Sequence, residues 1–162
     1  MNRLIPAAAG VMALAVGATA LAAGPSDFMK KAIQGDNSEI MLGQLAQKKA
    51  MNAGVKDFGQ TLVADHTQAK QDAVKLAATV GVTPPSTPMP EAKAEYKKLQ
   101  GMSGAAFDKE FVGYMVTDHK KDIADFTKEA NSGSGAVPDM ARKTLPTLKK
   151  HLAMAQKLQD QV

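Results

Sequence analysis

Three histidines stand out in the sequence, because two of them occur in a repeated pattern beside apolar residues. Segment 58–66 reads FGQTLVADH and segment 111–119 reads FVGYMVTDH, so each histidine follows a phenylalanine by eight residues. Eight residues make just over two turns of an α-helix, which places both side chains on one apolar face. A titratable ring on such a face supports the hypothesis of a functional site, although it does not name an activity.

Each of the four helices that the sequence predicts carries one metal-competent side chain on its interior face. Glu39 lies on the first helix, and His66, His119 and His151 lie on the next three. Counted at about 1.5 Å per residue from the nearest turn, all four lie near mid-helix and share one level. Interior sites of helical bundles are built from facing helices in this way. The pattern predicts a buried site for one divalent transition metal, and Zn, Fe, Mn, Ni or Cu would accept imidazole and carboxylate ligands.

The neighbouring carboxylates differ in where they point. Asp122 follows His119 by three residues and shares its helix face, so we expect it to assist as a further ligand. Asp65 and Asp118 each directly precede a histidine and point about 100° away from it. We expect these two to be acids on the helix flank or partners of a neighbouring helix, and as acceptors from imidazole they would still support a metal.

Two other functions remain open at this stage. Glu39 and the histidines also fit a buried polar network without an ion, which would make the chain a structural or interaction protein of the cell envelope. A ferritin-like di-metal oxidase is the third possibility, but the chain lacks the Glu-x-x-His pair of such enzymes. It also lacks a nucleophile elbow and a phosphate-binding glycine loop, so we assign no catalytic residue and leave enzymatic activity open.

The elements that must position these residues are four amphipathic helices. Apolar residues spaced by three and four predict helices at about 27–51, 55–80, 103–130 and 137–160, with no competing strand pattern. Segment 81–101 is rich in proline, is long enough to cross a bundle, and leaves room for a short helix at 91–99. The predicted fold is an all-α four-helix bundle with a long proline-rich connection between its second and third helices.

The N-terminus has the features of a secretory signal peptide. Arg3 precedes an uncharged run from Leu4 to Gly24, with small residues near Ala22. We therefore expect cleavage after a signal at 1–22 and a single mature domain at 23–162, in the periplasm, the envelope or the medium. An uncleaved membrane anchor is the alternative. No second apolar run follows, so we expect no stable membrane insertion of the mature chain.

The composition excludes several classes of site. The chain has no cysteine, so disulfides, thiolate ligands and cysteine nucleophiles are absent. The formal net charge is +4, and the lysines alternate with acidic residues as on a solvated surface. With five Phe, two Tyr and no Trp, the chain offers no stacking platform, so we do not expect it to bind nucleic acid.

Several ordered motifs resemble one known family. They are FMKKA at 28–32, EIMLGQLA at 39–46, the Asp-His pairs at 65–66 and 118–119, and KTLPTLKKH at 143–151. The chain resembles the bacterial secreted "domain of unknown function 4142" family, whose members are often labelled outer membrane proteins, from about Asp27 to Leu158. The resemblance implies a ferritin-like bundle with a crossover and an envelope location, but no settled activity. Of the ferritin-like di-iron ligands only Glu39 has a match, so the resemblance does not imply oxidase chemistry.

Overall fold

The protein folds into helices connected by short turns and one long connection. The computed structural model describes residues 24–162, and over this range it contains five α-helices and no strand. The helices are α1 (Pro25–Lys49), α2 (Ala53–Thr79), α3 (Pro90–Gln100), α4 (Gly104–Ala130) and α5 (Ala136–Gln159). The four long helices begin and end close to their predicted bounds, and α3 is the short helix expected in the connection. The predicted signal peptide at 1–22 lies outside the described residues.

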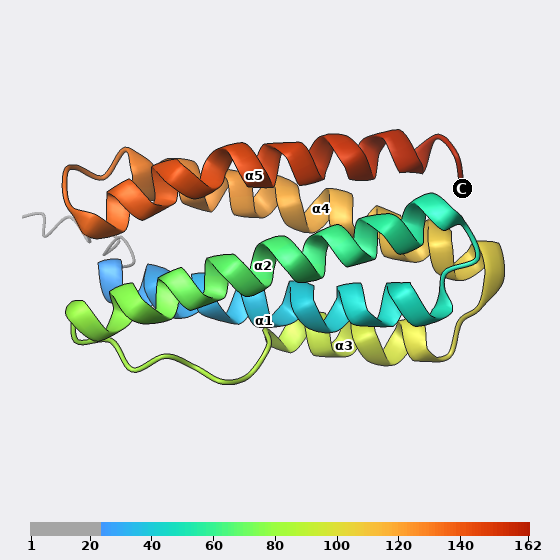
Figure 1. The fold of residues 1–162 in the computed structure, drawn as a ribbon, viewed down its shortest axis with the longest axis horizontal. Coiled ribbons are helices and arrows are strands. Elements are labelled where there is room, and N and C mark those ends of the chain that lie inside the picture. The colour runs from blue at the N-terminus through green and yellow to red at the C-terminus, as the bar shows by residue number, and fades with distance from the viewer. Residues whose placement is uncertain (1–23) are drawn as a thin grey trace, which may run out of the picture.

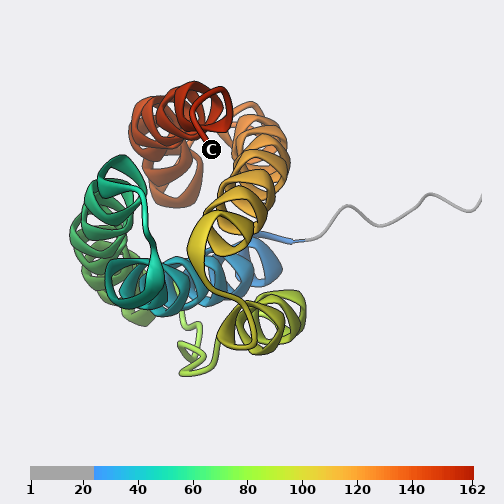
Figure 2. The ribbon, with the colours of Figure 1, turned by 90° about the vertical axis from the view of Figure 1, so that its right-hand side faces the viewer.

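The four long helices form one bundle, which confirms the all-α prediction. Figure 1 shows α1 antiparallel to α2 and α4 antiparallel to α5, and these two pairs pack most extensively. Seen end-on, α1, α2, α5 and α4 follow one another around the bundle, and α3 lies outside against α1 and α4 (Figure 2). None of the described helices is long and apolar enough to cross a membrane.

The connection between α2 and α4 returns the chain along the length of the bundle. Gly81 ends α2 with a φ of +70°, a conformation that glycine adopts without strain. The segment that follows is tied to α1, because Asn37 donates to the Pro85 carbonyl and the Met89 N–H donates to the Ser38 hydroxyl at 3.0 Å. As a result α4 starts at the end of the bundle where α2 started and runs parallel to it (Figure 1).

The apolar core consists of two clusters with the histidines between them. Along every long helix, the histidine or Glu39 falls between the residues of one cluster and those of the other. Burial of these side chains supplies the main driving force for packing the bundle. The larger cluster contains Leu42, Val55, Phe58, Leu62, Phe107, Phe111 and Met115, and the smaller contains Phe28, Met29, Ile33, Ala73, Ala77 and Ala141.

A close glycine contact brings α1 and α2 together near this polar layer. A Cβ added to Gly43 would lie 2.7 Å from the Gly59 carbonyl oxygen, and one added to Gly59 would lie 2.8 Å from the Gly43 carbonyl oxygen. Gly43 lies one turn after Glu39, so the contact fixes how near the interior face of α1 comes to α2.

Candidate metal centre

Three imidazoles from three helices meet in the middle of the bundle. His66 of α2, His119 of α4 and His151 of α5 each offer one ligand atom within 4.8 Å of the other two. Their side chains are buried, with relative exposures of 5%, 0% and 0%. The predicted common level of the three histidines is therefore correct, and the triad has the composition and proximity to hold a metal ion.

Two of the imidazoles donate a hydrogen bond to a carboxylate through one ring nitrogen. His66 donates from Nδ1 to Asp36 Oδ1 of α1 at 2.9 Å, and His151 donates from Nε2 to Asp65 Oδ2 of α2 at 2.9 Å. Metal-binding histidines usually donate their second ring N–H to a carboxylate or a carbonyl, which sets the tautomer and orients the ring. Both rings therefore have the support that ligands to a metal require.

The third imidazole is held by its own helix, and all three rings keep one nitrogen free. His119 donates from Nδ1 to the Met115 carbonyl at 3.0 Å. The remaining atoms, Nε2 of His66, Nε2 of His119 and Nδ1 of His151, are buried without a hydrogen-bond partner. Buried polar atoms in proteins are nearly always paired, so three unpaired nitrogens in one place require an explanation. A metal ion supplies one.

The separation of the three imidazoles is close to what an ion requires. A tetrahedral ion with bonds of about 2.0–2.1 Å places its nitrogen ligands about 3.3 Å apart. The three histidines have ligand atoms within 4.8 Å of one another, so an approach of at most about 1.5 Å would complete the coordination. A change in the torsion angles of a histidine side chain moves its ring nitrogens by a distance of this order.

Electrostatics keep the imidazoles in the form that binds metal. Burial and, to a smaller extent, the like charges of His66 and His151 lower the pKa of His119 to about 3. Burial also lowers the pKa of His151, which the hydrogen bond to Asp65 partly offsets. Neutral imidazole has the free lone pair that a metal needs, so these two rings require no deprotonation at neutral pH.

Glu39 lies beside the triad, but it is not one of the three groups that converge. Its side chain is fully buried, and both carboxyl oxygens lack a hydrogen-bond partner. Oε1 lies 4.0 Å from His119 Nδ1, the nitrogen that already donates to a carbonyl. Burial raises the pKa of Glu39 well above its usual range, and the negative charge of Asp118 adds to the effect. Its predicted role as a ligand stays a prediction.

Asp122 lies one turn further along α4, at the wall of a cavity. It is partly exposed and is not among the groups that converge with the histidines. Burial and, to a smaller extent, the negative charge of Asp118 raise its pKa to about 8. The predicted role of Asp122 as an assisting ligand also stays a prediction.

Sequence reasoning missed one residue of the centre and left another undecided. Asp36, which holds His66, was not singled out, although it precedes Glu39 by three residues and follows Ala32 by one turn on the same helix face. Asp65 is the partner of a neighbouring helix, because it accepts from His151 of α5 rather than from the histidine beside it in sequence.

Comparisons with known proteins agree with the helical fold. Among solved structures, the chain is similar to a DUF305 fragment from Deinococcus radiodurans, with a TM-score of 0.76 and 13% sequence identity. The match covers 85% of this chain and 96% of the other, and at this identity it bears on the fold alone. No curated protein matches the sequence. The family model described as "Domain of unknown function (DUF4142)" matches residues 11–158, and the chain therefore belongs to that family.

Proposed function

We propose that this protein is an exported helical-bundle protein that binds one divalent transition-metal ion through His66, His119 and His151. One observation carries the proposal: three buried imidazoles offer ligand atoms within 4.8 Å of one another, and each ring has one nitrogen without a partner while its other nitrogen donates to an acceptor. A buried network that needed no ion would have paired these atoms with one another or with other groups. The signal-like N-terminus supports a periplasmic or envelope location.

Glu39 is the fourth ligand in this proposal. An unpaired buried carboxyl is costly, and the positive charge of an ion would remove that cost and release its proton. Three imidazoles and one carboxylate, with no thiolate in the chain, suit Zn, Fe, Mn, Ni or Cu. Such a site would serve metal handling or protection against metal stress.

The centre differs from that of di-metal oxidases, even though the single long connection fits a ferritin-like order of helices. The chain has no Glu-x-x-His pair, and the group of potential ligands that lie close together in the described residues consists of three histidines. We therefore propose a site for one ion and not an oxidase.

Metal analysis of the exported protein tests the proposal. The full chain is expressed in a bacterium, purified from the exported fraction without chelators, and its metal content is measured by mass spectrometry. We expect about one ion per chain in the wild type and none in the double variant His66→Ala/His119→Ala. Circular dichroism shows whether the variant remains helical. Equal and negligible metal in both proteins, before and after incubation with Zn²⁺, Fe²⁺, Mn²⁺, Ni²⁺ and Cu²⁺, would refute it.

A further inference from the structure

A cavity leads from the surface between α1 and α4 to the edge of the histidine layer. Its volume is about 450 Å³, enough for an ion with its bound waters. His66 and Asp36 line its inner part, and His66 is 95% buried, with Nε2 free of any hydrogen bond. The cavity therefore reaches one of the three imidazoles of the proposed centre.

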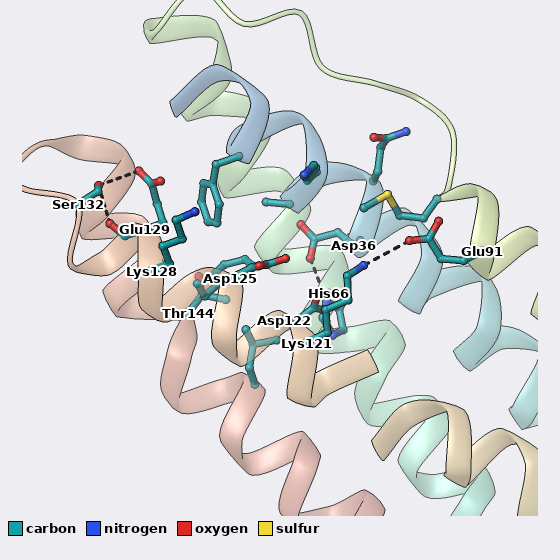
Figure 3. A pocket seen from close by; sticks show the side chains of 18 residues that line it. Asp36, His66, Glu91, Lys121, Asp122, Asp125, Lys128, Glu129, Ser132 and Thr144 are labelled. Atoms are coloured by element: carbon teal, nitrogen blue, oxygen red, sulfur yellow. Dashed lines mark hydrogen bonds and ion pairs between the residues drawn. The ribbon is translucent and has the colours of Figure 1, made fainter. Parts of the chain in front are cut away.

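Acidic side chains line this cavity along one face of α4. Asp125, Asp122 and His119 are spaced by three residues, so about 4.5 Å of helix separates each from the next. Asp125 is exposed at the surface, Asp122 is partly exposed, and His119 is fully buried. Figure 3 shows Asp122 and Asp125 projecting from α4 into the space between that helix and α1. Two potential cation ligands thus line the cavity on the same face of α4 as His119, and His66 is the histidine of the centre that the cavity reaches.

These two carboxylates are not used by the fold. Within residues 24–162, neither Asp122 nor Asp125 forms a hydrogen bond or an ion pair, whereas Glu91 on the same cavity pairs with Lys121 at 3.3 Å. Burial and the charges of Asp118 and Asp125 raise the pKa of Asp122, and the positive charge of Lys121, which pairs with Glu91, offsets this only in part. A cation in the cavity would supply a counterion.

A second, smaller cavity between α2 and α5 also reaches His66, but its acids are already paired. Its volume is about 290 Å³, and it is lined by Asp36, Asp65 and Asp72. Asp36 accepts from His66, Asp65 accepts from His151, and Asp72 accepts from Gln68 at 3.0 Å. This cavity therefore offers a cation no unpaired carboxylate, whereas the larger cavity offers Asp122 and Asp125.

We propose that the larger cavity is the path by which a divalent cation reaches the three histidines, with Asp125 and then Asp122 holding the ion on its way. The proposal rests on the metal-binding function proposed above and adds a route to it. Five acidic side chains and three lysines line the cavity, so its lining has a net negative formal charge although the chain as a whole has a formal charge of +4. A local excess of negative charge attracts cations and raises their rate of association.

The rate of metal uptake tests the path without changing a ligand or a charge. Gly35 lines the cavity, and a Cβ added there meets nothing within 4 Å, so Gly35→Leu adds a side chain at the cavity wall where its first carbon has room. Gly113 on α4 lies outside both cavities and is equally open, which makes Gly113→Leu the matched control. Apoprotein is mixed with Co²⁺ in a stopped-flow spectrophotometer, and release is followed after addition of a chelator.

We expect Gly35→Leu to lower the rates of uptake and release together by about tenfold or more, with Kd unchanged, and Gly113→Leu to leave both rates at the wild-type value. An obstacle on a path affects both directions equally, whereas damage to the centre would change Kd. Uptake by Gly35→Leu at the wild-type rate would overturn the proposal. Failure of the wild type to bind any ion would instead refute the metal-binding function itself, and the path with it.

A second experiment tests the role of the two acids. Asp122→Asn/Asp125→Asn should take up Co²⁺ about tenfold more slowly than the wild type at low salt, and its rate should depend less on ionic strength. The control, Asp57→Asn/Asp160→Asn, removes two exposed charges outside both cavities and should keep the wild-type rate. A loss of affinity caused only by faster release would make the two acids stabilisers of the bound ion and would overturn their role in the path.

Discussion

The three histidines do not offer the same nitrogen to the centre, and their hydrogen-bond partners explain the difference. His66 and His119 keep Nε2 free because Nδ1 donates to Asp36 or to the Met115 carbonyl. His151 keeps Nδ1 free because Nε2 donates to Asp65. A carboxylate or carbonyl only accepts, so each partner determines which nitrogen carries the proton and which can bind a metal.

Removing the charge of either carboxylate partner should weaken the centre without removing a ligand. Asp36→Asn and Asp65→Asn preserve shape but lose the charged acceptor that orients the ring. We expect each to lower metal affinity by about 10- to 100-fold, measured by competition with a chromogenic chelator. Asp72→Asn, on the same helix as Asp65 and bonded only to Gln68 and Lys75, should retain wild-type affinity. Unchanged affinity in both test variants would argue against metal support by these acids.

Glu39→Gln should separate stability from metal binding. In the metal-free protein a buried carboxyl without a partner destabilises the fold, so the neutral amide should leave Tm equal or raise it. In the presence of metal the same variant should lose affinity, because an amide is a poorer ligand than a carboxylate. Thermal melts with and without Zn²⁺ measure both effects. A variant that is less stable without metal, and as stable as the wild type with it, would contradict the assignment.

Asp122 should make the metal-free protein progressively less stable as the pH rises from about 4 to about 8. Its folded pKa of about 8 lies above the ordinary value of 3.8, so the folded state favours the protonated carboxyl. This contribution to stability is complete below about pH 4 and is lost as the pH rises through 8. Urea denaturation should show that Asp122→Asn gains stability relative to the wild type between pH 5 and pH 9. A difference that is constant across this range would show that Asp122 titrates normally.

At the scale of elements, the packing of α1 on α2 positions half of the centre. Asp36 and Glu39 come from α1, and His66 comes from α2, so the distance between these helices sets the Asp36–His66 hydrogen bond. The glycine contact between Gly43 and Gly59 lets the two backbones approach closely at this point. Side chains at either position would hold the helices apart.

Gly59→Ala tests this contact. The added methyl would lie 2.8 Å from the Gly43 carbonyl oxygen and 2.9 Å from Ala46 Cβ, so a helix must move. We expect a loss of about 1–3 kcal/mol in the free energy of unfolding, in part offset by the better helix propensity of alanine. Gly113→Ala, where nothing lies within 4 Å, should instead gain up to about 1 kcal/mol. Chemical denaturation measures both, and equal gains would show that the contact is not close.

At the scale of the molecule, an ion that joins three helices should stabilise the whole fold. A ligand that binds only the folded state stabilises it by about 2.7 kcal/mol at a free concentration one hundred times Kd. For a domain of this size we therefore expect a strong chelator to lower Tm by several degrees, and restored Zn²⁺ to reverse the change. His66→Ala/His119→Ala should show no response to either. An unchanged Tm would favour the structural protein that the sequence left open.

The whole-molecule arrangement was largely predictable, because it follows from periodicity. Apolar spacing placed the four long helices near their observed bounds, and the prolines between 84 and 90 marked the connection. His66, His119 and His151 each lie on the apolar face of their helix. These faces pack against one another in the bundle, so the three histidines point inward. The short α3 was also expected, since Glu91 to Leu99 follows the last proline as a helix-favouring segment.

What the sequence determined by itself was therefore the helices, their inward faces and the common level of the three histidines. Only the tertiary structure decided which ring nitrogens remain free, that Asp65 serves His151 rather than His66, and that Glu39 lies 4.0 Å from His119 Nδ1. The cavity beside Asp122 also belongs to this second group. The reason is that helical spacing fixes angle and height along one helix, whereas contacts between helices depend on their separation, rotation and side-chain rotamers.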